Sequence, residues 1–498
     1  MEFEKLLNGK ILDPIHGTIR VTDIEKKVIG HPLFQRLRNI KQNTFLYKVF
    51  PSAMHSRFEH SLGVMHISYN IIKNLLINSY RYDKKYNDSL LFKYLEFIPT
   101  KNIQELRLAA LLHDIGHGPM SHQFDSFVLT KKLLIKYLGD SFSDIYELIE
   151  KNVEHEHISL IFIKKILLDL DIKNDVCEEN ILKIIDSKYN GGIIYFNHNN
   201  VEYNIQPLLT SLISSCPIDS DRMDYLLRDS YFSGVKCGIY NVERLLMSVV
   251  PVLDGAKVCL GYKESSIDSI SEFIFSRASL FSQVYYHKTN RSFSAMLSKV
   301  CKKDEEKREE LINRIYQLDA YEEGNSIDLL EKFYLDNSDD YFINETIPEI
   351  VEGNHHDEKI IDDIVNRKPW KKLFEFKKYN SGTITEKVNK CFTSNLHSSI
   401  KEELDKYLTE NDYIIDIVTD NAFKDIEKTE IKLLIKKPDG SYHSKEIIEC
   451  GDKLDFNQSI RYFTRIFINP DITLDKVAVL IDNLNSIKEI TIKNHFEK

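Results

Sequence analysis

The sequence predicts a mainly helical protein: a helical body followed by a smaller α+β lobe. Apolar residues recur at helical spacing through most of residues 1–340, and strand-like alternation with turn signals becomes frequent only after them. We therefore expect a body at 1–340 that carries the functional site, and a lobe at 341–498 with a regulatory or oligomerising role. A chain of 498 residues is long enough for two or three domains.

Composition narrows the class of protein. The chain is 42% hydrophobic and 29% charged, as soluble globular proteins are, and no apolar run approaches the roughly 18 residues of a membrane span. A net charge of −10 argues against broad nucleic-acid binding. The charged N-terminus lacks the apolar stretch of a signal peptide, so we expect a cytoplasmic protein. The seven cysteines are scattered without Cys-x-x-Cys spacing, which predicts buried thiols rather than disulfides or a zinc knuckle.

Residues 56–77 form the first clear helix in the sequence. Its apolar positions are spaced 3, 4, 3 and 4 residues apart: Leu62, Met65, Tyr69, Ile72 and Leu76. Arg57 and His60 lie three apart on its first turn. A helix N-terminus favours anions, and an Arg adds a donor fork that suits phosphate oxygens.

The sequence predicts a second helix that ends in a His-Asp pair. The apolar run 106–112 predicts a helix buried on most sides, which His113-Asp114 and the following glycines terminate. Burying a carboxylate beside an imidazole is costly unless something compensates, and a metal ion is the usual compensation. A His-Asp hydrogen bond at a helix C-terminus remains the alternative at this point.

Two further polar pairs follow. A new helix starts near Ser121, and His122 and Asp125 lie at i, i+3, so the carboxylate can orient the imidazole. The next helix opens on His155-Glu156, which forms either a second proton-transfer pair or an exposed polar turn.

The segment 217–229 predicts another helix, because Pro217 and Ser220 mark its start and acids follow in the first turn. Helix capping does not explain why one face then carries Asp221, Tyr225 and Asp229 at i, i+4, i+8. A long helix at 264–288 has three residues on one face: Arg277, Phe281 and Tyr285.

The remaining signals are weaker. The basic run 34–42 is either a solvated helix face or a grip for phosphate, and the loop residue His16 is interpreted as structural. Residues 190–205 predict a hairpin or flap. In the lobe we expect a strand at 413–418, a hairpin of 431–435 with 446–450, and a strand at 477–481.

Four candidate ligands emerge from these helices: His60, His113, Asp114 and Asp221. Two imidazoles and two carboxylates suit Mg, Mn, Fe or Zn and leave positions for water and a substrate oxygen. Because the four come from distant helices, they can meet only inside a helical body.

This ordered set resembles the HD-domain phosphohydrolases, and in particular their deoxynucleoside triphosphate (dNTP) triphosphohydrolases, the SAM-and-HD and dGTPase-like group. The likeness covers roughly residues 10–300. It runs through these segments: 13–17, 34–38, 50–51, 56–63, 113–125, 219–229, Arg277 and 285–290. Since the motifs begin near residue 10, we expect no SAM domain before them.

The resemblance implies metal-dependent hydrolysis of a dNTP to a deoxynucleoside and inorganic triphosphate, by water attack at the α-phosphate. His122, oriented by Asp125, would protonate the leaving 5′-oxygen, with support from His117 and the pair His155-Glu156. Other implied contacts are Arg57, Arg222 and Arg277 to the triphosphate, Gln42 and Asp229 to the sugar 3′-hydroxyl, and Tyr225 and Tyr285 to the sugar ring. An aromatic ring against C2′ would exclude ribonucleotides.

Some positions depart from the family pattern. Tyr286 stands where many relatives place a Gln at the base edge, so base preference does not carry over. Lys10, Arg36 and Arg38 are weak candidates for regulatory nucleotide contacts, but Gly30 replaces an Asp of the guanine-activated relatives, so we do not expect activation by GTP of that type. Regulation by another nucleotide stays open, and relatives that build sites at interfaces imply a homo-oligomer, from dimer to tetramer or hexamer.

Two other functions remain as alternatives. One is an HD-domain nucleotidase or phosphodiesterase on another nucleotide, and the other is a non-catalytic module that binds nucleotide or nucleic acid. The retained sugar-pocket residues favour a dNTP substrate, and the intact ligands and His122-Asp125 pair favour an enzyme. Binding to nucleic acid or to a membrane is not expected.

Overall fold

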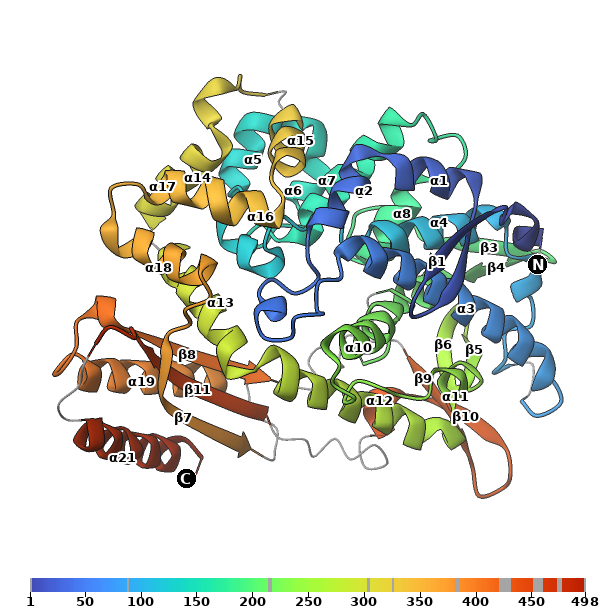
Figure 1. The fold of residues 1–498 in the computed structure, drawn as a ribbon. Coiled ribbons are helices and arrows are strands. Elements are labelled where there is room, and N and C mark those ends of the chain that lie inside the picture. Colours follow the sequence, from blue (N-terminus) through green and yellow to red (C-terminus); the bar gives the residue numbers. More distant parts are fainter. Residues whose placement is uncertain are drawn as a thin grey trace.

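The computed structural model describes residues 2–86, 89–213, 217–301, 305–324, 327–380, 386–420, 431–450, 460–472 and 477–496. The protein is mainly helical, with a helical body and a smaller α+β lobe at the C-terminal side, as the sequence predicts (Figure 1). Among the described helices, none is long and apolar enough to cross a membrane.

Four helices of the body position the site, and all four are predicted by the sequence. They are α3 (Arg57–Arg81), α4 (Thr100–Leu112), α7 (His155–Asp169) and α10 (Ser220–Ser233). Helix α3 packs against both α4 and α10, and its apolar stripe is buried in the core. It begins with a capping box, in which Ser56 and Glu59 satisfy each other's backbone N–H groups.

Nine other α-helices are described up to residue 301. They are α1 (Asp23–Gly30), α2 (Pro32–Gln35), α5 (Lys131–Leu138), α6 (Ser143–Tyr146), α8 (Glu178–Ile185), α9 (Gln206–Ser211), α11 (Val242–Leu246), α12 (Ile267–Leu280) and α13 (Lys288–Cys301). The helix expected at 264–288 is divided, because a π-helical turn (Phe281–Tyr285) follows α12.

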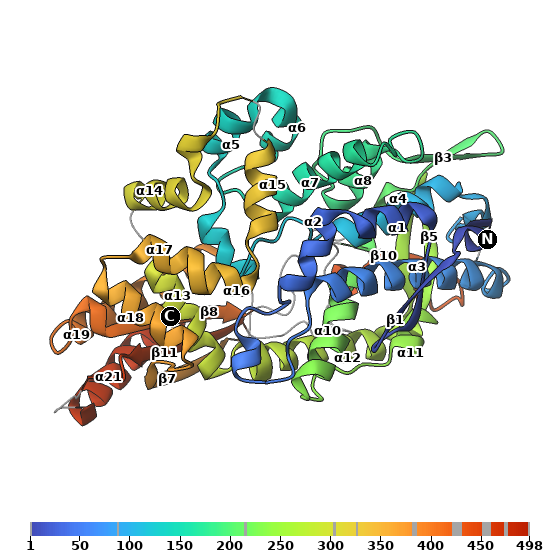
Figure 2. The same cartoon turned by 45° about the horizontal axis from the view of Figure 1, so that its top comes forward.

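A further helical group lies above the lobe, on the left side of the molecule, in both views (Figures 1 and 2). Its members are α14 (Glu305–Tyr316), α15 (Ile327–Asp336), α16 (Asp339–Tyr341), α17 (Ile347–Val351) and α18 (His355–Val365). Helices therefore continue past residue 340, and the domain boundary there stays a prediction.

The body carries a six-stranded sheet with the path β10-β9-β6-β4-β3 and with β5 paired to β6. Its strands are β3 (Tyr195–His198), β4 (Val201–Asn204), β5 (Val249–Asp254), β6 (Lys257–Lys263), β9 (Lys432–Lys436) and β10 (Tyr442–Glu446). The hairpin expected near 190–205 is β3-β4. A small separate hairpin joins β1 (Gly9–Asp13) to β2 (Gly17–Val21).

The lobe has an antiparallel sheet in the order β7-β11-β8, formed by β7 (Lys371–Asn380), β8 (Tyr413–Asp420) and β11 (Ile460–Ile468). Helices α19 (Glu386–Leu404) and α21 (Val477–Phe496) pack together beside it. The strand predicted at 413–418 is confirmed as part of β8.

Two lobe predictions are wrong. Residues 477–481 begin helix α21 instead of a strand, because Leu480 and Leu484 recur at helical spacing in the lobe core. The hairpin after Ile431 does form, but its second strand is Tyr442–Glu446, and Ile447–Cys450 is a 3₁₀ turn. The prediction of buried thiols holds for Cys259, Cys301 and Cys450; Cys177 and Cys237 are half-buried, Cys391 is exposed and Cys216 lies outside the described residues.

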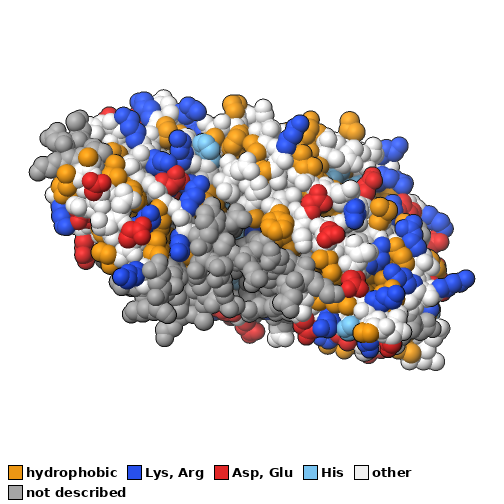
Figure 3. Space-filling model, turned by 90° about the horizontal axis from the view of Figure 1, so that it is seen from below, with side chains coloured by type: hydrophobic (Ala, Val, Ile, Leu, Met, Phe, Trp, Pro, Cys, Tyr) orange, Lys and Arg blue, Asp and Glu red, His pale blue; other side chains and the backbone are white. Residues whose placement is uncertain are grey.

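Charged side chains of both signs are interspersed on the face of the molecule seen in Figure 3.

Candidate active site

The four predicted metal ligands converge. His60 comes from the first turn of α3, His113 and Asp114 from the end of α4, and Asp221 from the first turn of α10. His60 Nε2 lies 3.0 Å from Asp221 Oδ1 and 3.7 Å from Asp114 Oδ2. His113 Nε2 lies 3.4 Å from Asp114 Oδ1 and 3.8 Å from Asp221 Oδ1. The ligand atoms of His60, His113 and Asp221 all lie within 4.8 Å of one another.

Both imidazoles are oriented for ligation. His60 Nδ1 donates to Asp224 Oδ2 at 2.8 Å, and His113 Nδ1 donates to the Ala110 carbonyl at 2.9 Å. With Nδ1 protonated in each ring, the Nε2 lone pairs face the two carboxylates. Both Nε2 atoms are buried and make no hydrogen bond of acceptable geometry within the described part of the chain. Orphaned lone pairs beside two carboxylates fit a divalent cation.

The electrostatics agree with this interpretation. Burial alone would lower the pKa of His60, but the carboxylates of Asp221 and Asp224 raise it to about 10. Burial would raise the pKa of Asp114, but His113, Arg57 and His60 hold it well below its usual range. The carboxylates thus favour positive charge at the two imidazoles, and a divalent cation bound there would supply that charge in place of protons. The donor set of nitrogen and oxygen is compatible with Mg, Mn, Fe or Zn.

Arg57 lies at the edge of this centre. Its side chain is buried; Nη1 donates to Asp114 Oδ2, and Nε donates to Ser121 Oγ at 2.9 Å. A guanidinium in this position can neutralise charge on a phosphate next to the ligands.

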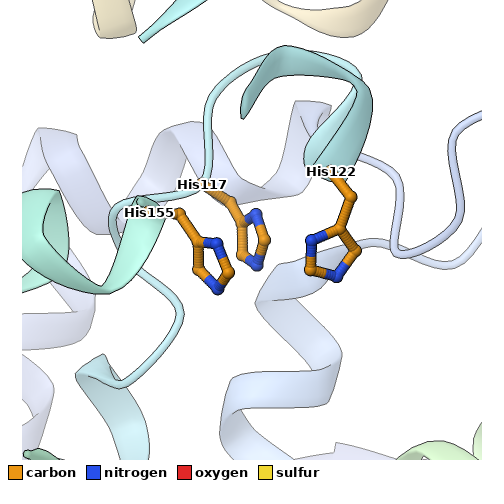
Figure 4. Close-up of side chains that lie close together, drawn as sticks. All are labelled: His117, His122 and His155. Atoms are coloured by element: carbon orange, nitrogen blue, oxygen red, sulfur yellow. The ribbon is translucent and has the colours of Figure 1, made fainter. Parts of the chain in front are cut away.

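Three histidines form a second cluster beside the ligands (Figure 4). The rings of His117 and His155 stack with centroids 3.6 Å apart and planes 18° apart, and His122 is edge-on to both. Burial lowers the pKa of His117 well below its usual range and that of His155 to about 3, so both rings are neutral at pH 7. The ligand atoms of the three imidazoles lie within 4.8 Å of one another, so the cluster could transfer protons or hold a metal ion.

The carboxylates paired with these histidines lie close to them. His122 Nδ1 is 3.6 Å from Asp125 Oδ2 on the 3₁₀-helix Ser121–Phe127, and His155 Nδ1 is 3.3 Å from Glu156 Oε2. His122 is two-thirds exposed, with 66% of its side chain accessible. Such long contacts are common where a catalytic pair tightens only around its substrate.

A pocket of about 620 Å³ opens next to the ligands, within the usual size range for small-molecule sites. The predicted substrate contacts that line it are Gln42, Arg57, Arg222, Tyr225, Asp229, Tyr285 and Tyr286. Arg277 is set back from the lining and donates from Nε to the Tyr225 hydroxyl at 3.3 Å. A larger cavity of about 840 Å³ meets this pocket at Glu156 and Ile185 but is lined by none of the predicted ligands.

The far end of the pocket is a carboxylate framed by aromatic rings. Asp229 accepts hydrogen bonds from His55 Nε2 at 2.5 Å, from Asn43 Nδ2 at 2.9 Å and from the Tyr285 hydroxyl. These partners outweigh burial and lower the pKa of Asp229. Gln42 Oε1 is buried nearby without a hydrogen-bond partner among the described residues. A hydroxyl-bearing ring such as a sugar suits this environment.

Several residues of the site escape sequence reasoning. Asp224 accepts from His60, from His16 Nε2 at 2.6 Å and from Arg228 Nε at 2.8 Å and Nη2 at 2.9 Å. Gly63 makes room for it, because a Cβ there would overlap Asp224 Oδ1. The i, i+4 spacing of Asp224 and Arg228 is the one signal in the sequence. His55 and Asn43 leave no comparable pattern.

The regulatory candidates lie elsewhere. Arg36 is buried, and its guanidinium donates to the carbonyls of Ile115 and His117, which is a structural contact; its role as a regulatory nucleotide contact stays a prediction. Lys10 is exposed on β1, and Arg38 is exposed and stacks over the Phe58 ring at 3.5 Å. Neither lines the pocket.

Comparison with known proteins identifies the class. The HD domain family matches residues 57–229, a range that contains all four candidate ligands, so the chain carries an HD domain.

Among its relatives are the deoxynucleoside triphosphate triphosphohydrolase SAMHD1 homolog of Dictyostelium discoideum, 32% identical over 300 residues (60% of this chain, 50% of that protein), and the uncharacterized protein YwfO of Bacillus subtilis, 32% identical over 306 residues (59% and 56%). The chain thus spans about half the length of these relatives. The predicted resemblance to HD-domain dNTP triphosphohydrolases is confirmed. A solved structure of a hypothetical protein from Aquifex aeolicus shares the fold, with a TM-score of 0.61 and 24% identity over 96% of this chain and 99% of that one.

Proposed function

We propose that this HD-domain protein is a metal-dependent dNTP triphosphohydrolase, which converts a dNTP to a deoxynucleoside and inorganic triphosphate. The observation that carries the proposal is the convergence of two oriented imidazoles and two carboxylates beside a pocket that ends in Asp229 and Tyr285. One end of the pocket fits a phosphate on a cation, and the other fits a sugar.

The ligands His60, His113, Asp114 and Asp221 would hold a divalent ion, which polarises a phosphoryl oxygen and acidifies a water. Arg57, already beside Asp114, neutralises charge on the phosphate.

His122 is the proton donor to the leaving 5′-oxygen, since it is the accessible member of the histidine cluster. The neutral rings of His117 and His155 behind it can pass a proton to it, and Asp125 and Glu156 orient the group.

Substrate selection falls to the other end of the pocket. Asp229 accepts a hydrogen bond from the sugar hydroxyl, together with Gln42. Tyr285, fixed by its bond to Asp229, lies edge-on to Phe281 with the ring centroids 4.7 Å apart. Packed against C2′ of the sugar, this ring would exclude a 2′-hydroxyl. Arg222, Arg277 and Tyr225 complete the contacts to the nucleotide, and Tyr286 contacts the base. We also propose that the protein acts as a homo-oligomer.

A product assay tests the proposal. The protein is incubated with each dNTP and NTP, alone and in mixtures, with Mg²⁺, Mn²⁺ or Fe²⁺, and the products are separated by anion exchange. Release of inorganic triphosphate supports the proposal. Release of orthophosphate or pyrophosphate rejects it and favours an HD-domain nucleotidase or phosphodiesterase.

A further inference from the structure

Asp339 is a buried carboxylate outside the stretch that matches the HD domain. It opens the short helix α16, which belongs to the helical group α14–α18. Its Oδ2 accepts a hydrogen bond from the Lys41 backbone N–H at 2.8 Å, and its Oδ1 accepts one from the Met120 backbone N–H at 2.6 Å. One side chain therefore holds two backbone segments that are far apart in the sequence.

Both segments carry pocket residues. Lys41 directly precedes Gln42, which we assign to the sugar end. Met120 adopts a left-handed backbone conformation (φ 64°) just before the 3₁₀-helix that presents His122, the proposed proton donor. A non-glycine residue in this conformation is held by its surroundings, and the bond to Asp339 is part of them.

The two segments are also tied to each other. Ser121 Oγ donates to the Lys41 carbonyl at 2.7 Å, and Thr44 Oγ1 donates to the Met120 carbonyl at 2.6 Å. Arg57 in turn donates to Ser121 Oγ, which links the pair to the metal centre. Asp339 adds to these contacts, because it accepts hydrogen bonds from the backbone amides of the same two segments.

We propose that Asp339 is a positioning residue that sets the geometry between the sugar-binding segment at Gln42 and the proton-donor segment at His122. The inference deepens the proposed function and rests on it. A carboxylate is required because both amides donate, and only an ionised carboxylate offers an acceptor to each; an Asn offers one acceptor and one NH₂ group.

The neighbouring residue provides a matched control. Asp340 approaches the same lysine, with Oδ1 3.1 Å from Lys41 Nζ, but its side chain is 76% exposed. Among the described contacts it accepts no backbone amide of either segment. Asp340→Asn removes the same charge near Lys41 and leaves the amide bonds intact.

Hydrogen–deuterium exchange tests whether Asp339 holds the Lys41 and Met120 amides, and it does not depend on activity. In the unaltered protein, the Lys41 and Met120 amides are expected to exchange slowly; rapid exchange of both overturns the inference, and this readout needs no variant to fold. In Asp339→Asn both amides should exchange at least tenfold faster, and in Asp340→Asn they should not change. Equal rates in the two variants also overturn it.

Steady-state kinetics test the consequence. With a dNTP substrate, Asp339→Asn should lower kcat at least tenfold and raise KM at unchanged metal content, whereas Asp340→Asn should stay within twofold of the unaltered protein. In His122→Ala, adding Asp339→Asn should lower kcat less than twofold further, because its effect on kcat acts through His122. A full tenfold further loss overturns the inference. If the unaltered protein releases no triphosphate from any dNTP, the proposed function fails, and the exchange experiment still decides the role of Asp339.

Discussion

Replacing Asp224 by Asn should weaken metal binding although Asp224 is not a ligand. Asp224 fixes the ring of His60 by accepting from Nδ1, and it is the fully buried partner of Arg228. An Asn keeps the shape but presents an NH₂ group to one of these donors. His60 then loses the contact that aims Nε2 at the metal position.

The substitution should lower two separate quantities, the metal affinity and the free energy of unfolding. Loss of a partner that orients a ligating His costs about 10–100-fold in metal affinity, or about 1.4–2.7 kcal/mol. Removing one member of a buried ion pair costs about 3–5 kcal/mol of folding free energy. Asp13 still pairs with Arg228 in the variant, because its Oδ2 lies 2.9 Å from Arg228 Nη1. We therefore expect the loss of folding free energy to fall at the lower end of its range.

Competition between the protein and a fluorescent chelator for Mn²⁺ or Zn²⁺ measures the affinity, and urea unfolding measures stability. His16→Gln is the matched control, because His16 bonds the other oxygen of Asp224 and leaves the bond to His60 in place. Its metal affinity should change less than about threefold. If folded Asp224→Asn binds metal within twofold of the unaltered protein, the reasoning about ligand orientation is refuted.

Three further outcomes are expected. Asp114→Asn should abolish triphosphate release and metal uptake while circular dichroism stays unchanged, because it removes a ligand; full activity would contradict the metal assignment. Tyr285→Ala should lower the dNTP/NTP ratio of kcat/KM by about 10–200-fold, and unchanged selectivity would remove its gatekeeping role. The buried His155 resists protonation, so the unfolded chain takes up the proton first below about pH 6.5, and this residue alone lowers the unfolding free energy by about 2 kcal/mol between pH 7 and pH 5. His155→Gln should lose that share of the acid slope in urea unfolding at the two pH values, and an unchanged slope would contradict the depressed pKa.

The helices around the metal centre could be predicted because their signals are local. The 3-4 spacing in α3, the apolar run before His113 and the capped start of α10 each lie within one segment. Since the candidate ligands lie at the ends of such helices, the same patterns are enough to propose them.

The partners that hold the ligands could not be predicted. His16 and Asp224 are 208 positions apart, and Asp339 is still farther from the amide of Lys41. Contacts of this kind depend on how helices pack, which a single sequence does not encode in its spacing. The strand predicted at 477–481 is wrong for a related reason. A short apolar run fits a helix and a strand equally well, and only packing decides between them.

The return of β9 to the sheet of the body has a practical consequence. Along the chain, β8 belongs to the lobe, β9 and β10 to the body, and β11 to the lobe again, as its middle strand. Proteolytic trimming after Asp420 would therefore remove β9, one of the two parallel neighbours of β6, and would also remove β11, the strand that joins β7 to β8. A protein shortened at its C-terminal end in this way should lose the stability of both the body and the lobe. Separating the two parts would require internal cleavage, with both fragments kept together.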